Sequence, residues 1–182
     1  SADFLLSNRK ELFPDVPIVF HTNTRKELND RTDGMGTGVI PDEVHARSLD
    51  AALRLHPNTE NVFVISGTIE RDKMVETLLK EQFKRFDGKV AITYLTDLPL
   101  DDLLAQVRAL PERSLIFFSR QDYEDPGRRL SMFDVLVLLS NATKVPIYSS
   151  GNFVSYGTIG GYAINQYECG VQAANIALQI LN

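Results

Sequence analysis

The sequence contains few of the residues on which disulfide-rich and metal-binding proteins depend. Its single cysteine, Cys169, excludes an internal disulfide and a cysteine-rich metal site. Its three histidines, His21, His45 and His56, lie in different segments, and none makes a metal-ligand spacing with another histidine or with the cysteine. We therefore expect neither a metal nor a cofactor.

Long apolar runs and strong positive charge are also missing. No apolar run could span a bilayer, and the chain does not begin with a signal peptide. Because residues 2–6 are typical of a helix, we interpret the chain as a piece of a longer protein. The net charge is −5 and the largest basic cluster is Arg128–Arg129, whereas binding to nucleic acid needs a positive face. We expect no nucleic-acid partner.

The remaining composition is that of a globular domain, with 43% hydrophobic and 24% charged residues among 182. Short apolar runs rich in β-branched and aromatic residues predict strands that are buried on both faces. These runs cover residues 18–20, 62–65, 90–94, 115–118 and 145–148. Pro146 lies within the last run, so it should stand at the start of that strand or on a sheet edge.

Segments with helical spacing of apolar residues separate these runs. They cover residues 44–53, 70–86, 100–110, 131–139 and 167–181. The segment 131–139 is apolar nearly all round, which predicts a largely buried helix. Strands and helices that alternate with short connections predict an α/β fold, with three layers, α/β/α, around a mainly parallel sheet.

The stretch 23–38 is polar, lacks periodicity and contains Gly34, Gly36 and Gly38. A dinucleotide-binding loop needs a strand directly before its glycines and a helix directly after them, whereas Val39 and Ile40 follow here. We interpret the stretch as a flexible linker. A second glycine-rich segment, 156–164, could let the backbone approach a ligand or could simply bend the chain.

Polar residues follow several predicted strands, at the ends that parallel strands bring to one edge of a sheet. Ligands bind at this edge in open α/β folds. The first group follows the run ending at 65, the second follows the run ending at 118, and the third follows the run ending at 148. The candidate ligand-binding residues are Ser66, Thr68, Arg120, Asp122, Tyr123, Ser149, Asn152 and Phe153.

Plainer interpretations of these residues stay open. Ser66 or Thr68 could cap the following helix without touching a ligand, and residues 119–125 could form a solvated loop. Catalysis is less well supported. Asp122 and Asp125 have no nucleophile or metal partner nearby in sequence, and Ser149 lacks both a G-x-S-x-G elbow and a recognisable histidine base. We expect this domain not to be an enzyme.

Several motifs together resemble one family. They are residues 12–20, 53–57 and 64–67, then 160–163 leading into Cys169–Ala174. In this order they are similar to the substrate-binding proteins of ABC transporters, in the branch that serves as the extracytoplasmic sensor of bacterial signalling proteins. The resemblance implies the type I periplasmic-binding-protein fold, in which two lobes flank a ligand cleft. Thr68 and Asp122 are the nearest matches to ligand-touching residues of the transport relatives.

By this resemblance, residues 1–39 are the end of the first lobe and a linker. Residues 40–182 are the second lobe, of which 157–182 could return to the first lobe. The implied function is a small-ligand sensor for a histidine kinase or diguanylate cyclase. The solute-binding component of an ABC transporter is the alternative, followed by an enzyme on a similar scaffold. The implied ligand is an amino acid or another small organic molecule, a homodimer is possible, and the parent protein would be anchored in the inner membrane with this domain in the periplasm.

Overall fold

The computed structural model describes residues 4, 7–8, 11–12, 14, 16–22, 28–29, 37–40, 43–67, 70–125 and 128–181. The chain divides into two compact units. One unit comprises residues 1–42 and 164–182, and the other comprises residues 43–163. The second unit contains the main sheet and all of the described candidate ligand-binding residues.

The main sheet has the strand order β4-β3-β5-β8, and every neighbouring pair is parallel. The strands are β3 (Asn61–Ser66), β4 (Ala91–Thr96), β5 (Ser114–Arg120) and the short β8 (Ile147–Tyr148). The predicted parallel sheet is therefore confirmed. The ends where these strands finish all lie along one side of the sheet, which we call the carboxyl edge.

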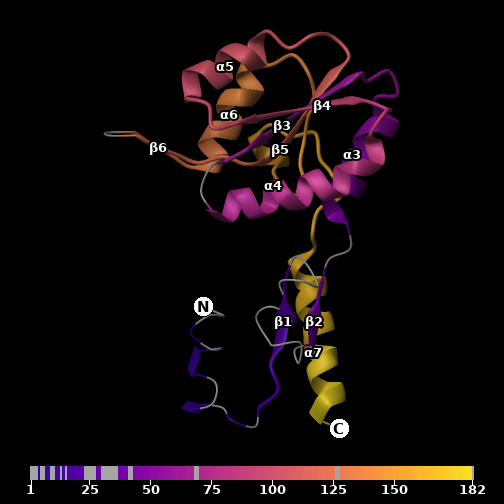
Figure 1. Cartoon of the computed structure of the whole chain (residues 1–182), viewed down its shortest axis with the longest axis vertical. Helices are drawn as coiled ribbons and strands as arrows, with labels where there is room; N and C mark the ends of the chain where they lie inside the picture. Colours follow the sequence, from indigo (N-terminus) through magenta and orange to yellow (C-terminus); the bar gives the residue numbers. More distant parts are fainter. Residues whose placement is uncertain are drawn as a thin grey trace. The chain divides into compact units, whose positions relative to one another are not determined.

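Helices cover both faces of this sheet, which confirms the three-layer α/β/α prediction (Figure 1). On one face, α3 (Val44–Leu55) and α4 (Glu70–Phe83) pack with Val64, Leu115 and Phe117. On the other face, α5 (Leu100–Arg108) and α6 (Met132–Ala142) pack with Ile65, Ile116 and Phe118. Consecutive residues of β3 and β5 thus pack into opposite cores, which is why these strands are apolar at residues 62–65 and 115–118.

The helix ends follow from local chemistry. Pro57 stands just beyond α3, while α4 is followed by the 3-10 helix η1 (Lys84–Phe86) and by Gly88 at φ +75°, a conformation that favours glycine. A capping box begins α6, since the Ser131 hydroxyl accepts from the Asp134 amide and the Asp134 carboxylate accepts from the Ser131 amide. Pro146 immediately precedes β8, as predicted.

In the second unit, one alternative that the sequence left open does not hold, and one prediction is wrong. Residues 119–125 do not form one solvated loop, because β5 continues to Arg120 and β6 (Tyr123–Asp125) pairs antiparallel with β7 (Arg128–Leu130). Helix α6 is only half covered, with Phe133 38% and Val137 39% exposed. Its outer side meets the 3-10 helix η2 (Val154–Tyr156), whose Tyr156 ring lies 4.5 Å from that of Phe133.

The first unit contains β1 (Val19–His21), β2 (Thr37–Val39) and α7 (Gln166–Leu181), which packs beside both strands. The linker prediction is wrong for Thr37 and Gly38, because β2 pairs parallel with β1. Gly38 makes this pairing possible, since a Cβ there would lie 2.2 Å from the Phe20 carbonyl oxygen. Apart from residues 28 and 29, the rest of 23–36 lies outside the described residues. Within the described ranges, no helix has the length and apolarity to cross a membrane.

The core of the second unit depends on Phe117, which is fully buried with its ring 5.1 Å from that of Phe83. We expect Phe117→Ala to lower the free energy of unfolding by about 3–5 kcal/mol, because it removes apolar contacts and leaves a cavity. Urea unfolding followed by far-UV circular dichroism measures this change. The control Leu55→Ala, at a side chain that is 67% exposed, should change stability by less than about 0.5 kcal/mol. Equal effects of the two substitutions would contradict the assigned core.

Candidate ligand-binding site

The predicted residue groups lie at the carboxyl edge, in the order in which their strands pair. β3 ends at Ser66, β5 ends at Arg120, and β8 ends one residue before Ser149. Since β5 pairs with both β3 and β8, its trailing residues lie between the other two groups. Thr68 lies outside the described residues.

Ser66 and Gly67 form the base of the first group. Ser66 is fully buried, and its Oγ has no hydrogen-bond partner among the residues that the structure describes. A Cβ on Gly67 would lie 2.0 Å from Oδ2 of Asp72 and 3.3 Å from the carbonyl oxygen of Arg120. The missing side chain at position 67 therefore lets the Asp72 carboxylate lie directly against the backbone, next to the end of β5.

Arg120 lies between two carboxylates. Its Nε donates to Oδ2 of Asp122 at 2.8 Å and forms an ion pair with Oδ1 of Asp72 at 3.7 Å. The Arg120 side chain is 30% exposed, whereas that of Asp72 is only 2% exposed. A buried carboxylate is costly without a nearby positive charge, so the Arg120 guanidinium stabilises the charged form of Asp72. We call Asp72, Arg120 and Asp122 the Arg120 cluster.

Asp122 and Tyr123 make hydrogen bonds within the second unit. Oδ1 of Asp122 accepts from the amide of Met132 at 2.8 Å, so both carboxylate oxygens of Asp122 already have donors. The hydroxyl of Tyr123 donates to the carbonyl of Leu98, also at 2.8 Å. Asp122 therefore fixes Arg120 and the start of α6, and Tyr123 ties the end of β5 to the residues after β4.

The third group differs in exposure from residue to residue. Ser149 is 1% exposed, and its hydroxyl accepts from the amide of Gly151 at 3.1 Å. Asn152 is exposed, and the half-buried ring of Phe153 lies 5.8 Å from that of Phe133 on α6. The first turn of α6 thus joins two groups, because Met132 bonds Asp122 and Phe133 packs on Phe153.

Sequence reasoning missed several residues that support these groups from neighbouring helices. Asp72 lies in the first turn of α4, and His45 and Ser48 lie in the first turns of α3. The ring Nδ1 of His45 lies 2.8 Å from the hydroxyl of Ser150. Burial lowers the pKa of His45 from 6.5 to about 4, so its ring is neutral at neutral pH. The only signal in the sequence was a polar residue at the start of a helix, which usually marks a cap.

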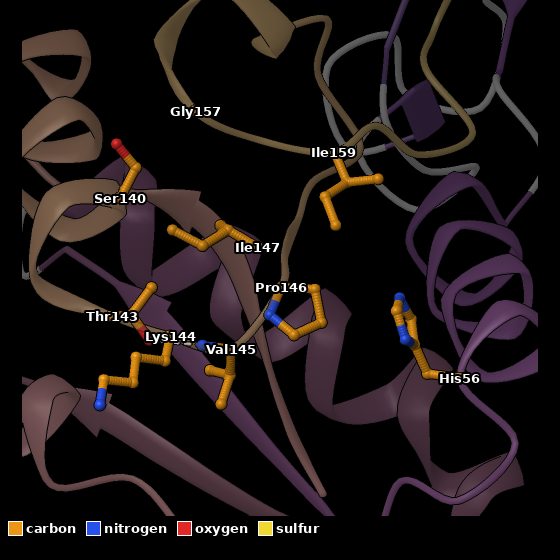
Figure 2. Close-up of a pocket in the computed structure, with 9 residues that line it drawn as sticks. All are labelled: His56, Ser140, Thr143, Lys144, Val145, Pro146, Ile147, Gly157 and Ile159. Carbon is orange, nitrogen blue, oxygen red and sulfur yellow. Dashed lines mark hydrogen bonds between the residues drawn. The ribbon is translucent and has the colours of Figure 1, made fainter. Parts of the chain in front are cut away.

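A hollow of about 380 Å³ lies elsewhere, at the amino end of β8. Figure 2 shows its lining, in which Pro146 is central and Lys144 extends away from His56. None of the seven predicted ligand-binding residues that the structure describes lines it. Its lining residues are His56, Ser140, Thr143, Lys144, Val145, Pro146, Ile147, Gly157 and Ile159.

Residues 2–182 match the family described as ABC transporter substrate binding protein. The chain belongs to this family. The match covers nearly the whole sequence, and it confirms the resemblance to ABC substrate-binding proteins. No functionally curated protein is similar enough to the chain to count as a match.

Solved structures show the same fold at low sequence identity. An ABC domain from Streptococcus pneumoniae in complex with L-tryptophan has a TM-score of 0.61 at 15% identity, over 99% of this chain and 62% of that one. A conserved domain protein from Vibrio cholerae has a TM-score of 0.56 at 18% identity, over 100% of this chain and 69% of that one. A LacI family transcriptional regulator from Bifidobacterium animalis has a TM-score of 0.58 at 12% identity, over 97% of this chain and 74% of that one.

The chain therefore spans less than two thirds of the Streptococcus domain. The family and the fold together support a ligand-binding domain of the periplasmic-binding-protein type, and the family suggests an extracytoplasmic location.

The Arg120 cluster gives a prediction for stability. Arg120→Met should lower the free energy of unfolding by about 2 kcal/mol, because it removes the positive charge that forms an ion pair with the buried Asp72 carboxylate. Adding Asp72→Asn should restore about half of this loss, since the buried charge is then gone. Arg113→Met is the control, because Arg113 pairs with Glu60 on the surface, where an ion pair contributes about 0–1 kcal/mol. A double variant no more stable than Arg120→Met would contradict the pairing.

His45 gives a prediction for pH dependence. The folded pKa of about 4 lies below the unfolded value of 6.5, so between these pH values only the unfolded chain binds the proton. The contribution of His45 to stability is complete above pH 6.5 and falls by about 3 kcal/mol as the pH drops to 4. Urea unfolding at pH 7 and at pH 4.5 should therefore show that the free energy of unfolding falls less between these two pH values in His45→Asn than in the unchanged chain. An equal loss of stability in His45→Asn and in the unchanged chain would contradict this role of His45.

Proposed function

We propose that this chain is the ligand-binding part of an extracytoplasmic protein, and that it binds a small organic molecule at the carboxyl edge of the second unit. The observation that carries the proposal is the position of Arg120. Its guanidinium is held by two carboxylates at the end of the central strand, between the groups that follow β3 and β8. In this proposal the second unit is the second lobe of a two-lobe binding protein, and the first unit belongs to the first lobe.

Arg120 is the proposed polar contact. Its Nε is engaged by Asp122, whereas its two Nη groups have no hydrogen-bond partner among the described residues. A planar guanidinium with free terminal donors is suited to the oxygens of a carboxylate or carbonyl group. In this proposal Asp122 and Asp72 hold the guanidinium rather than touch the ligand.

Asn152 and Phe153 complete the proposed site. Asn152 offers an exposed amide, and the Phe153 ring offers an apolar surface fixed by its contact with Phe133. A few polar groups beside an aromatic surface are typical of small-molecule sites. An amino acid or a similar small organic molecule would suit this chemistry, and the L-tryptophan in the Streptococcus complex makes that compound the first to test.

For the parent protein we propose a sensor role, in which ligand binding controls a histidine kinase or diguanylate cyclase across the inner membrane. The sequence resemblance to the sensor branch supports this role. Transport has equal support, because the family is described by its ABC substrate-binding members. The full gene sequence distinguishes the two: a transmembrane helix and a signalling module after residue 182 indicate a sensor, and a lipoprotein signal without such a module indicates transport. We propose no enzymatic activity for the domain itself, and a homodimer is part of the sensor proposal.

Ligand binding should appear as thermal stabilisation. We would screen L-tryptophan, other amino acids, nucleosides and aromatic acids against this chain and against the longer parent protein. A ligand at a hundred times its dissociation constant should add about 2.7 kcal/mol of stability. Arg120→Lys keeps the positive charge beside Asp72 but removes the planar fork, so it should abolish most of the shift.

Asn152→Ala should also reduce this shift, whereas Asn141→Ala, at an exposed asparagine on α6, should not. A shift that survives both Arg120→Lys and Asn152→Ala would place the ligand elsewhere. The absence of any shift in the parent protein across the whole panel would count against the proposed ligand class.

A further inference from the structure

A single buried hydroxyl joins two separate backbone segments of the second unit. Ser48 on α3 is fully buried, and its Oγ lies 2.7 Å from the amide nitrogen of Tyr162. The same oxygen lies 3.1 Å from the carbonyl of Tyr162 and 3.3 Å from the carbonyl of Ser149. A hydroxyl carries one proton and two lone pairs, so it accepts from the Tyr162 amide and shares its proton between the two carbonyls.

Gly161 brings these two segments into direct contact. A Cβ at this position would lie 1.7 Å from the carbonyl oxygen of Ser149 and 3.0 Å from Oγ of Ser48. The amide of Ser149 donates to the carbonyl of Gly160 at 3.1 Å, and the amide of Ile159 donates to that of Ile147 at 2.8 Å. Residues 159–162 therefore run along β8 and its trailing loop, held by backbone bonds on one side and by Ser48 on the other.

Two neighbours of Ser48 strengthen the same junction. His45 bonds the hydroxyl of Ser150, one residue beyond Ser149. Arg47 donates to the Tyr162 hydroxyl at 3.3 Å, and its guanidinium lies 5.2 Å from the centre of that ring. The start of α3 thus contacts both the loop after β8 and the segment 159–162.

We propose that Ser48 is a positioning residue that couples the loop after β8 to the segment 159–162, so that neither can shift without the other. The chain passes from the second unit into the first between Ala163 and Ile164, directly beyond Tyr162. The coupling itself rests on the contacts above. Its role in ligand response rests on the proposed function, in which Asn152 and Phe153 of the same loop contact ligand. Ligand at this loop would then restrain the residues that lead from one unit to the next.

Amide hydrogen exchange of the unliganded chain, with and without Ser48→Ala, tests the coupling. The informative amides are those of Ser149 and Gly151, because their own acceptors, Gly160 O and Ser149 Oγ, are unchanged by the substitution. We expect both amides to exchange about tenfold faster in Ser48→Ala. Exchange at the Tyr162 amide should rise as well, but this amide loses its acceptor directly and therefore says nothing about coupling.

Ser140→Ala is the matched control. Ser140 is a helical serine of the second unit like Ser48, although it is only partly buried, and its hydroxyl donates to the Val137 carbonyl within α6. This variant should leave exchange at Ser149 and Gly151 within about twofold of the unchanged chain. Should Ser48→Ala fail to fold, Ser48→Cys gives the same comparison with a weaker hydrogen-bonding group of similar size.

Gly161→Ala is a second test, since it keeps serine at position 48 but forces the two backbones apart, with its Cβ pressing on the Ser149 carbonyl. It should accelerate the same amides, and its folding can be followed by circular dichroism. Exchange at Ser149 and Gly151 that stays unchanged in Ser48→Ala while Tyr162 accelerates would overturn the proposal. Because the measurement needs no ligand, its failure is distinct from the failure of the panel to reveal binding.

Discussion

The parallel pairing of β5 with both β3 and β8 is the constraint on which the rest of the second unit depends. Its register, with Phe117 opposite Val64 and Tyr148, aligns the strands so that all of them finish at the same edge. Parallel strands need a crossover connection, and the crossovers β3→β4 and β4→β5 run in opposite directions along the sheet. Because such crossovers are right-handed, α4 and α5 lie on opposite faces. The polar residues at the carboxyl edge are therefore brought together by backbone hydrogen bonds and not by attraction among themselves.

Charge at this edge is arranged around one buried carboxylate. Asp72 lies against Gly67 and beside Arg120, and Arg120 in turn bonds Asp122, which also holds the first residue of α6. The ends of β3 and β5 and the starts of α4 and α6 are thus linked through a single guanidinium. An arginine used in this way can serve stability and ligand contact together, because the two carboxylates engage its Nε and leave the donors of its Nη groups for other partners.

Much of this fold was predictable from the sequence because apolar periodicity decides it. The apolar centres of two strands, 62–65 and 115–118, and the helices around 74–83 and 100–108 follow directly from the spacing of their apolar residues, whereas the polar end of β5 at Ser119 and Arg120 does not. The edge that carries the candidate site follows from strand order. What could not be predicted depends on contacts between distant residues. The pairing of β2 needs Phe20 beside Gly38, and the role of Asp72 needs Arg120, 48 positions later in the chain. A helical serine such as Ser48 carries no mark in the sequence that separates it from an ordinary small residue.

Gly67 limits which side chains can stand at position 67, because the Asp72 carboxylate lies directly against it. The space that a methyl group would need there is occupied by a carboxylate oxygen of Asp72. During mutational drift, a lineage that gains any side chain at position 67 must displace this carboxylate, and with it the partner of Arg120. A smaller, uncharged residue at position 72 would make room for such a side chain, so this contact links the residue types that suit the two positions.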